Sequence, residues 1–346
     1  MMEILKLFLN HGPKVAAIAA ATFALSSCGI IYEDLDPCPP TGASLRFVYD
    51  YNMEFANAFP AQVDCLTLYV YNSDGNLIET RVETSDALTE ENYRMDLDLP
   101  EGQYHLVAHG GLACEDASFA PVAPHEIGHH HTDLSVSMHQ HCLSDDAHRN
   151  LHRFFYGALD IDVATENLTD ATVRLMRNTN DIQIALQHIH GTPVDVNDFR
   201  FAIYDDNTLF RHDNEIIPAG EVTYSPWATA NRATGLVDDD GSRADGQTEV
   251  QVALAELSVS RLVTSNHTRL HVTKASDGST VIDIPLINYM LLYKSHNISN
   301  MSNQEYLDRE NQWNFLFFLD ETKNDVWLEN LIKIQDWTVR INDVEI

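Results

Sequence analysis

The sequence predicts an all-β protein of two tandem β-sandwich domains behind an export signal. Apolar and polar residues alternate with a period of two over many short segments, a pattern typical of strands with one buried face. Turn residues separate these segments at short intervals, and only residues 285–293 and 304–311 have helical character. A chain of 346 residues is long enough for two domains, each with its own core.

The N-terminus has the pattern of a lipoprotein signal. Residues 15–25 form an apolar run that is long enough for a secretory signal and too short to cross a bilayer as a helix. The following Leu25-Ser26-Ser27-Cys28 resembles the bacterial lipobox, in which cleavage occurs before a diacylglycerol-modified cysteine. We therefore expect residues 1–27 to be the signal peptide and Cys28 to be the lipidated first residue. The alternative is an ordinary secretory signal cut near Ser27, with an unmodified Cys28.

Lipidation would hold the protein permanently on a membrane. Two diacylglycerol chains and an amide-linked acyl chain such as palmitate bury dozens of methylenes, each worth about 0.8 kcal/mol. Residues 28–42 are rich in proline and acidic residues, so we expect a lipidated acidic tether that holds a folded body away from the bilayer.

The N-terminal sandwich is expected over residues 43–166. Residues 52–60 are predicted to form a loop or short helical turn that buries Phe55 and Phe59, and residues 110–132 are predicted to be irregular. A hairpin turn is expected at 73–76. Strands are predicted at 45–51, 65–71, 77–83, 93–99, 103–109, 134–138 and 154–163.

The C-terminal sandwich is expected over residues 167–346, after a polar segment at 166–170. Residues 226–247 are rich in Asp, Gly and Ala and are predicted to form a long exposed loop. Strands are predicted at 172–177, 181–188, 198–205, 221–224, 248–260, 268–274, 281–284, 313–319 and 331–341.

The charge balance argues against a nucleic-acid partner. The formal net charge is −31, and removal of the signal, with two lysines and one glutamate, makes it −32. Nucleic-acid binding needs clustered Lys and Arg, which this chain lacks. An anionic membrane surface would also repel the protein, so the lipid on Cys28 has to provide the attachment.

Four further cysteines lie in the first half of the chain: Cys38, Cys65, Cys114 and Cys142. An even number in an exported protein permits two disulfides in three connectivities, and the sequence does not choose among them. Free buried thiols are the alternative.

Several segments together resemble the Bacteroidales fimbrial-anchor lipoproteins, which are FimB-like minor fimbrial subunits. The similar segments follow the family order behind the lipobox. They are 32–39, 45–53, 63–71, 104–111, 173–182 and 334–339. His109 departs from the family pattern, which has a tryptophan or another large residue before the paired glycines Gly110 and Gly111.

This resemblance implies two transthyretin-like β-sandwich domains and a surface-exposed anchor or accessory subunit of a fimbrium, held in the cell outer membrane by lipid on Cys28. The implied partners are the shaft subunit, or pilin, and other minor fimbrial subunits. In related shaft subunits, proteolysis removes a strand and an extended segment of the next subunit fills the gap. We expect a sheet edge, or the C-terminal strand around 337–346, to pair with the first shaft subunit.

Histidine is the one residue in local excess, with His125, His129, His130, His131, His139, His141, His148 and His152 close together. The His-Glu-x-x-His pattern of zinc hydrolases is absent, so we expect solvated loop histidines and no metal site. Cys114 near His109 is a weak candidate nucleophile, and acidic pairs such as Asp205-Asp206 are expected in solvated loops. The sequence predicts no catalytic residue and no cofactor.

A second interpretation belongs to another functional class. It is a surface lipoprotein that binds glycan or another ligand through loops at the ends of the sandwiches, for example through 226–247 or Trp227. Co-purification with a pilin would separate the two interpretations, because a glycan-binding protein does not require a pilin.

Overall fold

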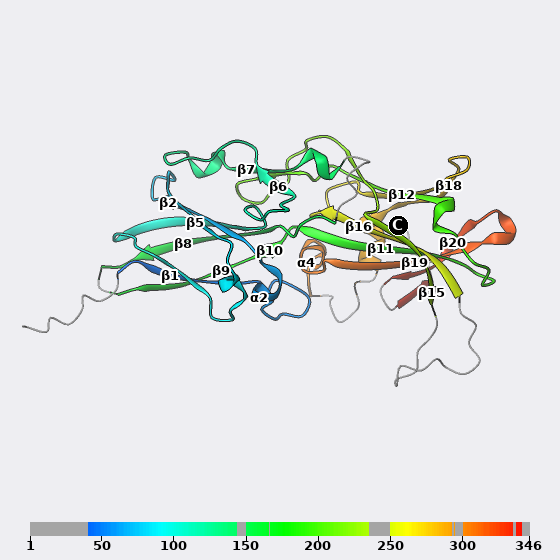
Figure 1. Ribbon diagram of the computed structural model, residues 1–346, viewed down its shortest axis with the longest axis horizontal. Coiled ribbons are helices and arrows are strands. Elements are labelled where there is room, and N and C mark those ends of the chain that lie inside the picture. The colour runs from blue at the N-terminus through cyan, green and yellow to red at the C-terminus, as the bar shows by residue number, and fades with distance from the viewer. Residues whose placement is uncertain are drawn as a thin grey trace, which may run out of the picture.

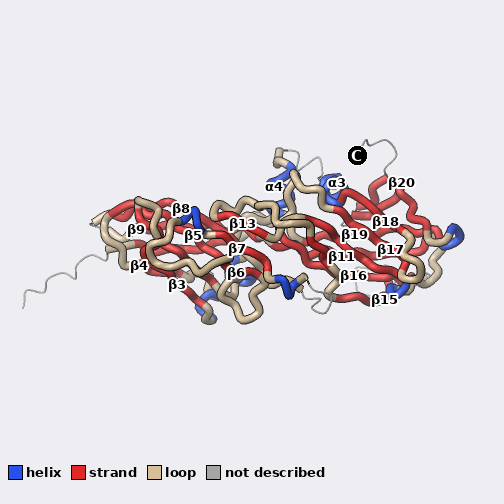
Figure 2. The backbone as a smooth tube through the Cα atoms, turned by 90° about the horizontal axis from the view of Figure 1, so that it is seen from above, coloured by secondary structure: helices blue, strands red, loops and turns tan. Residues whose placement is uncertain are grey.

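The computed structural model describes residues 41–143, 150–165, 167–234, 250–292, 294, 300–334 and 337–340. These residues form an elongated body in which strands run roughly along the long axis (Figure 1, Figure 2). Within this part of the chain, no helix is long and apolar enough to cross a membrane. The predicted signal peptide and most of the tether lie outside the described residues.

The N-terminal half is a sandwich of two sheets with strand orders β4-β1-β9 and β10-β8-β5-β2-β3. Alternate residues of both sheets point inward, among them Leu45 and Phe47 on one sheet and Leu68 and Leu106 on the other, and they share one core. The strands are β1 (Ala43–Val48), β2 (Leu66–Asn72), β3 (Leu77–Glu83), β4 (Arg94–Leu97), β5 (Gly102–Gly110), β8 (Phe155–Val163), β9 (Thr169–Arg174) and β10 (Met176–Arg177).

The C-terminal half packs a six-stranded sheet, β15-β16-β11-β19-β20-β21, on a four-stranded sheet, β14-β12-β17-β18. Its core includes Ile184, Phe317 and Trp313. The strands are β11 (Thr179–His188), β12 (Phe199–Asp205), β14 (Val222–Tyr224), β15 (Ala228–Thr234), β16 (Val250–Ser260), β17 (Arg269–Lys274), β18 (Thr280–Pro285), β19 (Gln312–Asp320), β20 (Val326–Ile334) and β21 (Trp337–Arg340). The predicted all-β fold with tandem sandwiches is confirmed.

Two short helices occur where the sequence predicts helical character: α3 (Leu286–Leu292) follows β18, and α4 (Asn303–Arg309) precedes β19. α2 (Phe59–Gln62) begins at the end of the loop or turn predicted over 52–60 and extends beyond it. Ser302 begins α4 as its N-cap, because its side chain accepts a hydrogen bond from the backbone N–H of Glu305.

A further, small sheet crosses between the halves. It has the order β13-β7-β6, with β6 (Phe119–Pro121) and β7 (Ser135–Met138) from the first half and β13 (Leu209–Arg211) from the second. Strand β6 lies in a segment that was predicted to be irregular, and β13 was not predicted. Both are three-residue strands, too short for a period-two pattern to be recognised.

Strands β9 and β10 come after the boundary predicted at 166/167, yet both pair with strands of the N-terminal half. β9 runs parallel to β1, and β10 pairs with β8. Strand β11, which begins at Thr179, is the first to join the C-terminal sheets. On this pairing we propose that the division between the two sandwiches lies near Asn178.

Several local predictions were wrong. The single strand predicted at 331–341 is divided between β20 and β21, which pair antiparallel. Asp205, predicted in a solvated loop, is buried at the end of β12. Residues 228–234 of the predicted 226–247 loop form β15, which pairs with β16 along its whole length; residues 235–247 lie outside the described residues. Phe59 is buried as predicted, but the Phe55 side chain is 63% exposed. The turn closed by the Asn52 amide places Phe55 at a positive φ of 51°, which directs it out of the core.

Candidate functional site

The tether enters the fold through a central strand. β1 pairs along all six of its residues with β9 and along four of them with β4. The predicted lipidation residue, Cys28, and also Cys38 lie outside the described residues, whereas Ala43 is fully buried at the start of β1. Any load on the tether therefore acts on a strand that is hydrogen bonded on both sides.

A buried polar network joins the two halves beside this strand. The Arg177 side chain is 2% exposed and donates to Thr179 Oγ1 at 3.0 Å, to Asn311 Oδ1 at 3.2 Å and to Asp181 Oδ2 at 2.7 Å. The Asn311 amide also donates to the Tyr49 hydroxyl at 2.6 Å, and burial raises the pKa of Tyr49. Because these residues come from distant parts of the sequence, no local motif could have predicted the network.

Further contacts fix the halves to each other. The side-chain amides of Asn178 and Asn214 donate to each other's carbonyl oxygens at 2.7 and 3.1 Å, and both residues are buried. The Tyr156 hydroxyl donates to the backbone carbonyl of His212 at 3.1 Å. With the β7–β13 pairing, these bonds make the two sandwiches one continuous structure.

A cavity of about 820 Å³ opens between the halves. The Arg309 guanidinium lies 4.0 Å from the ring centre of Tyr51 and 4.8 Å from that of Phe55, which explains how an exposed phenylalanine is held in place. Arg174 forms an ion pair with Asp50 on the same wall. The cavity thus combines an aromatic surface with charged groups of both signs.

The last strand of the described chain lies at a sheet edge. β21 pairs antiparallel with β20, from Leu331 opposite Arg340 to Ile334 opposite Trp337. Among the described residues, no strand pairs with its other side, and β15 is the opposite edge of the same sheet. Figure 1 shows β1 beginning at one end of the long axis and β20 at the other. β21 pairs with residues 331–334 of β20, which lie beside Phe315 to Phe317 of β19. The terminal edge therefore runs along the middle of the C-terminal sheet, whereas the tether enters the N-terminal sandwich.

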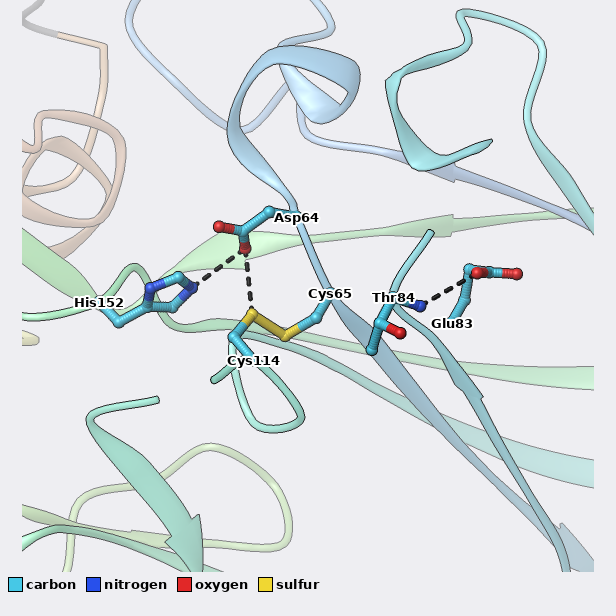
Figure 3. Close-up of a disulfide and its surroundings, with 6 residues drawn as sticks. All are labelled: Asp64, Cys65, Glu83, Thr84, Cys114 and His152. Atoms are coloured by element: carbon cyan, nitrogen blue, oxygen red, sulfur yellow. Dashed lines mark hydrogen bonds and ion pairs between the residues drawn. A yellow bond between two sulfur atoms is a disulfide. The ribbon is translucent and has the colours of Figure 1, made fainter. Parts of the chain in front are cut away.

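Within the described part of the chain, one disulfide is present, between Cys65 and Cys114 (Figure 3). The Asp64 carboxylate lies 3.1 Å from the Cys114 sulfur and 3.0 Å from His152 Nε2, so these four side chains form a compact group. The disulfide leaves neither sulfur available as a thiolate ligand or a nucleophile. This result removes Cys114 as the candidate nucleophile.

The histidine-rich loop, residues 125–131, packs against the N-terminal half. His129 and His141 are exposed as predicted. The expectation of solvated histidines was wrong for the half-exposed members of the group, which are His125, His130, His131, His139 and His152. The loop backbone hydrogen bonds to the β2–β3 hairpin, through Gly75 O and Leu77 N. The ring centre of His131 lies 5.1 Å from that of His105, 4.5 Å from that of His130 and 5.3 Å from that of His212. Burial, together with the charges of these three imidazoles, lowers the pKa of His131. His148 lies outside the described residues.

His109, the residue that departs from the family pattern, is a core residue. Its ring is 3% exposed, stacks on Phe154 with ring centres 5.6 Å apart, and meets the edges of Tyr69 and Tyr156. Its Nδ1 is buried without a hydrogen bond. Burial lowers the pKa of His109 to about 3, so the ring is neutral and fills the space of an aromatic residue.

The model of the family described as fimbrillin-A associated anchor proteins Mfa1 and Mfa2 matches residues 35–343. The chain belongs to this family. The family is one of fimbrial anchor proteins and not of enzymes, so membership establishes a fimbria-associated role at the cell surface. The resemblance predicted from the sequence is confirmed. No curated protein sequence matches the chain.

Solved structures share the fold of this chain. A candidate adhesin from Bacteroides thetaiotaomicron is 48% identical, with a TM-score of 0.81 over 89% of this chain and 100% of that chain. A candidate polysaccharide-binding protein from the same organism is 28% identical, with a TM-score of 0.73 over 88% of this chain and 99% of that chain. The fimbrial anchor protein Mfa2 from Porphyromonas gingivalis is 16% identical and shares the fold, with a TM-score of 0.61 over 86% and 98%.

Proposed function

We propose that this Mfa2-family member is a lipid-anchored outer-membrane anchor or accessory subunit that joins a fimbrial shaft to the cell surface through β-strand pairing. The observation that carries the proposal is that β21, in the C-terminal sandwich of a member of an anchor family, has an open edge among the described strands, whereas the strand that follows the tether belongs to the N-terminal sandwich. Strand addition to an open edge supplies main-chain hydrogen bonds for affinity and alternating side chains for specificity.

The strand order supports a load-bearing role. Tension on a lipid at Cys28 would pass along the tether to β1 and from there by strand pairing to β9. β9 continues through β10 into β11, which lies between β16 and β19 in the six-stranded sheet. The Arg177 network lies where the chain passes from one sandwich to the other. A continuous hydrogen-bonded path therefore leads from the tether to the sheet that carries β21.

The lipid is tested by replacing Cys28 with Ala in cells that make the fimbria. We expect intact fimbriae to be shed into the medium, because the remaining tether has no membrane affinity. The matched control is Cys38→Ala, which removes a second cysteine of the tether and leaves the lipobox intact. If fimbriae stay on Cys28→Ala cells, the lipid is not the attachment.

The shaft contact is tested by deleting residues 337–346 from a chain that carries an affinity tag between residues 238 and 244. We expect the pilin to be lost from the pull-down, with the melting temperature measured to check folding. Val339→Pro is a milder second variant, because proline removes one strand donor. Ala230→Pro, on the opposite edge strand β15, is the control. Retention of the pilin by the deletion and its loss with Ala230→Pro would assign the contact to β15 instead.

One observation favours a second candidate function, ligand binding. The 28% identical relative is described as a candidate polysaccharide-binding protein, and the cavity between the halves presents Phe55 and Tyr51 beside Arg309. Aromatic faces stack on sugar rings, so this cavity is a better candidate than the half-buried Trp227. A Phe55→Ser variant that loses binding on a glycan array and keeps its pilin would support this function.

A further inference from the structure

Two turns meet at the far end of the C-terminal sandwich and bring together one imidazole and two carboxylates. His190 lies in the turn after β11, Asp320 is the last residue of β19, and Glu321 begins the short 3₁₀ helix η8 (Glu321–Lys323). One ring nitrogen and one oxygen from each carboxylate all lie within 4.8 Å of one another. The closest pair is His190 Nδ1 and Glu321 Oε2, at 3.2 Å.

The two carboxylates are shielded from water. The side chains of Asp320 and Glu321 are 9% and 15% exposed, whereas that of His190 is 59% exposed. Glu321 Oε2 has essentially no contact with solvent and lies 3.2 Å from His190 Nδ1. When that nitrogen carries no proton, it cannot donate to the buried oxygen, so a cation bound by both atoms would stabilise the carboxylate.

The other oxygens are held by neighbouring groups. Thr192 Oγ1 donates to Glu321 Oε1 at 3.0 Å, and the backbone N–H and hydroxyl of Thr322 donate to Asp320 Oδ1 at 3.1 and 2.6 Å. Such bonds orient ligands around a metal ion. Lys323 Nζ lies 3.0 Å from Asp320 Oδ2, but its side chain is 70% exposed and is free to move into solvent when a more strongly charged ion binds.

The turn that carries the two carboxylates is unusually constrained. Asn324 and Asp325 both have positive φ, at 63° and 57°. Lys274 Nζ donates to Asn324 Oδ1 and Asp325 Oδ2 at 2.8 Å each, and His188 Nε2 lies 3.1 Å from Asp325 Oδ1. Left-handed conformations of non-glycine residues persist only where their surroundings hold them, and they gather at functional sites. The donors are thus preorganised.

We propose that His190, Asp320 and Glu321 bind a divalent transition-metal ion, for which Zn²⁺ is the best match. One imidazole and two carboxylates are three of the four ligands of a tetrahedral zinc site, which leaves one position for water or a donor from another protein. Ca²⁺ needs six to eight oxygens, and Mg²⁺ needs octahedral oxygen ligands, so both fit this donor set poorly. The ion would fix the β19–β20 turn directly before the two terminal strands.

The experiment is calorimetric titration of the detergent-solubilised full lipoprotein with ZnCl₂ after treatment with EDTA. We expect one saturable site that His190→Ala and Glu321→Gln each weaken at least tenfold. His129→Ala, which removes an exposed histidine of the histidine-rich loop, is the matched control and should leave the isotherm unchanged. Because His190 is exposed, His190→Ala keeps the test valid if Glu321→Gln fails to fold.

Co²⁺ provides a second readout, since its visible absorption reports tetrahedral coordination and should be lost in His190→Ala. The proposal is overturned if no saturable site is found, if both site variants titrate like the wild type, or if His129→Ala abolishes binding. Ca²⁺ binding as tight as that of Zn²⁺ would overturn the assignment of the metal class. None of these outcomes depends on a fimbrial role.

Discussion

The neutral, buried His109 predicts a specific loss of stability in acid. In the unfolded chain a histidine titrates near its usual pKa of 6.5, whereas burial lowers the pKa of His109 in the folded protein to about 3. As the pH falls, the unfolded state therefore binds the proton before the folded state does, which lowers the free energy of unfolding. The contribution of His109 to stability is fully present above pH 6.5 and declines until the pH approaches 3.

The size of the effect follows from these two pKa values. Linkage gives a loss of about 2 kcal/mol between pH 8 and pH 5, and about 3 kcal/mol by pH 4. No reduction for solvent screening is needed because the ring is 3% exposed. Against a total stability of about 5–15 kcal/mol, such a loss is readily measured.

The assay is urea unfolding of the wild type and of His109→Phe at pH 8 and pH 5. Phenylalanine keeps an aromatic ring against Phe154 and cannot be protonated, so the variant should lose about 2 kcal/mol less than the wild type over this interval. Carboxylates that titrate in both proteins cancel in the comparison. His267→Gln, at an exposed histidine, should leave the pH dependence unchanged. If the wild type and His109→Phe lose stability in parallel, the argument from burial is refuted.

Three further predictions concern stability. The disulfide links Cys65 and Cys114, which are 49 residues apart, so chain entropy predicts that the double variant Cys65→Ser/Cys114→Ser unfolds with a free energy about 4 kcal/mol lower. Reductant should destabilise the wild type much more than this variant. Gly111→Ala should lower the free energy of unfolding by about 2–4 kcal/mol, because Gly111 has a positive φ and an added Cβ would meet the Arg153 carbonyl. The control is Gly128→Ala, at a similar φ but in open space, which should lower it by about 1 kcal/mol. Equal melting temperatures of the two variants would contradict this. Asn311→Ala should cost about 1–3 kcal/mol and loosen the two halves, which limited proteolysis at the junction would detect; an unchanged digestion pattern would argue against this role.

Much of the fold could be predicted from the sequence because half-buried strands impose a period of two. The alternation around Leu45, Leu68 and Leu106 marks β1, β2 and β5, and the turn predicted at 73–76 marks the β2–β3 hairpin. Prediction failed for strands that lack the period of two. β6 and β13 are too short to show a period. β15 has a mostly polar sequence and forms a strand because it pairs with β16.

Some features of the candidate sites could likewise be predicted from the sequence, and others needed the structure. A lipobox is a contiguous motif, so the sequence by itself places the expected lipid at Cys28, and the run of family segments identifies the fimbrial family. Pairing of Cys65 with Cys114 rather than with another cysteine needed the structure, since spacing leaves three connectivities open.

Only the tertiary structure brings together Arg177 and Asn311 at the junction, or His190 and Glu321 at the end of the C-terminal sheet. These pairs are more than a hundred residues apart, and strand pairing and sheet packing, which local sequence does not encode, bring them into contact. The sequence by itself determined the strand periodicity and the expected export and lipid signals. The tertiary structure decided which edge stays open, which histidines are buried and which distant charges meet, because each depends on long-range packing.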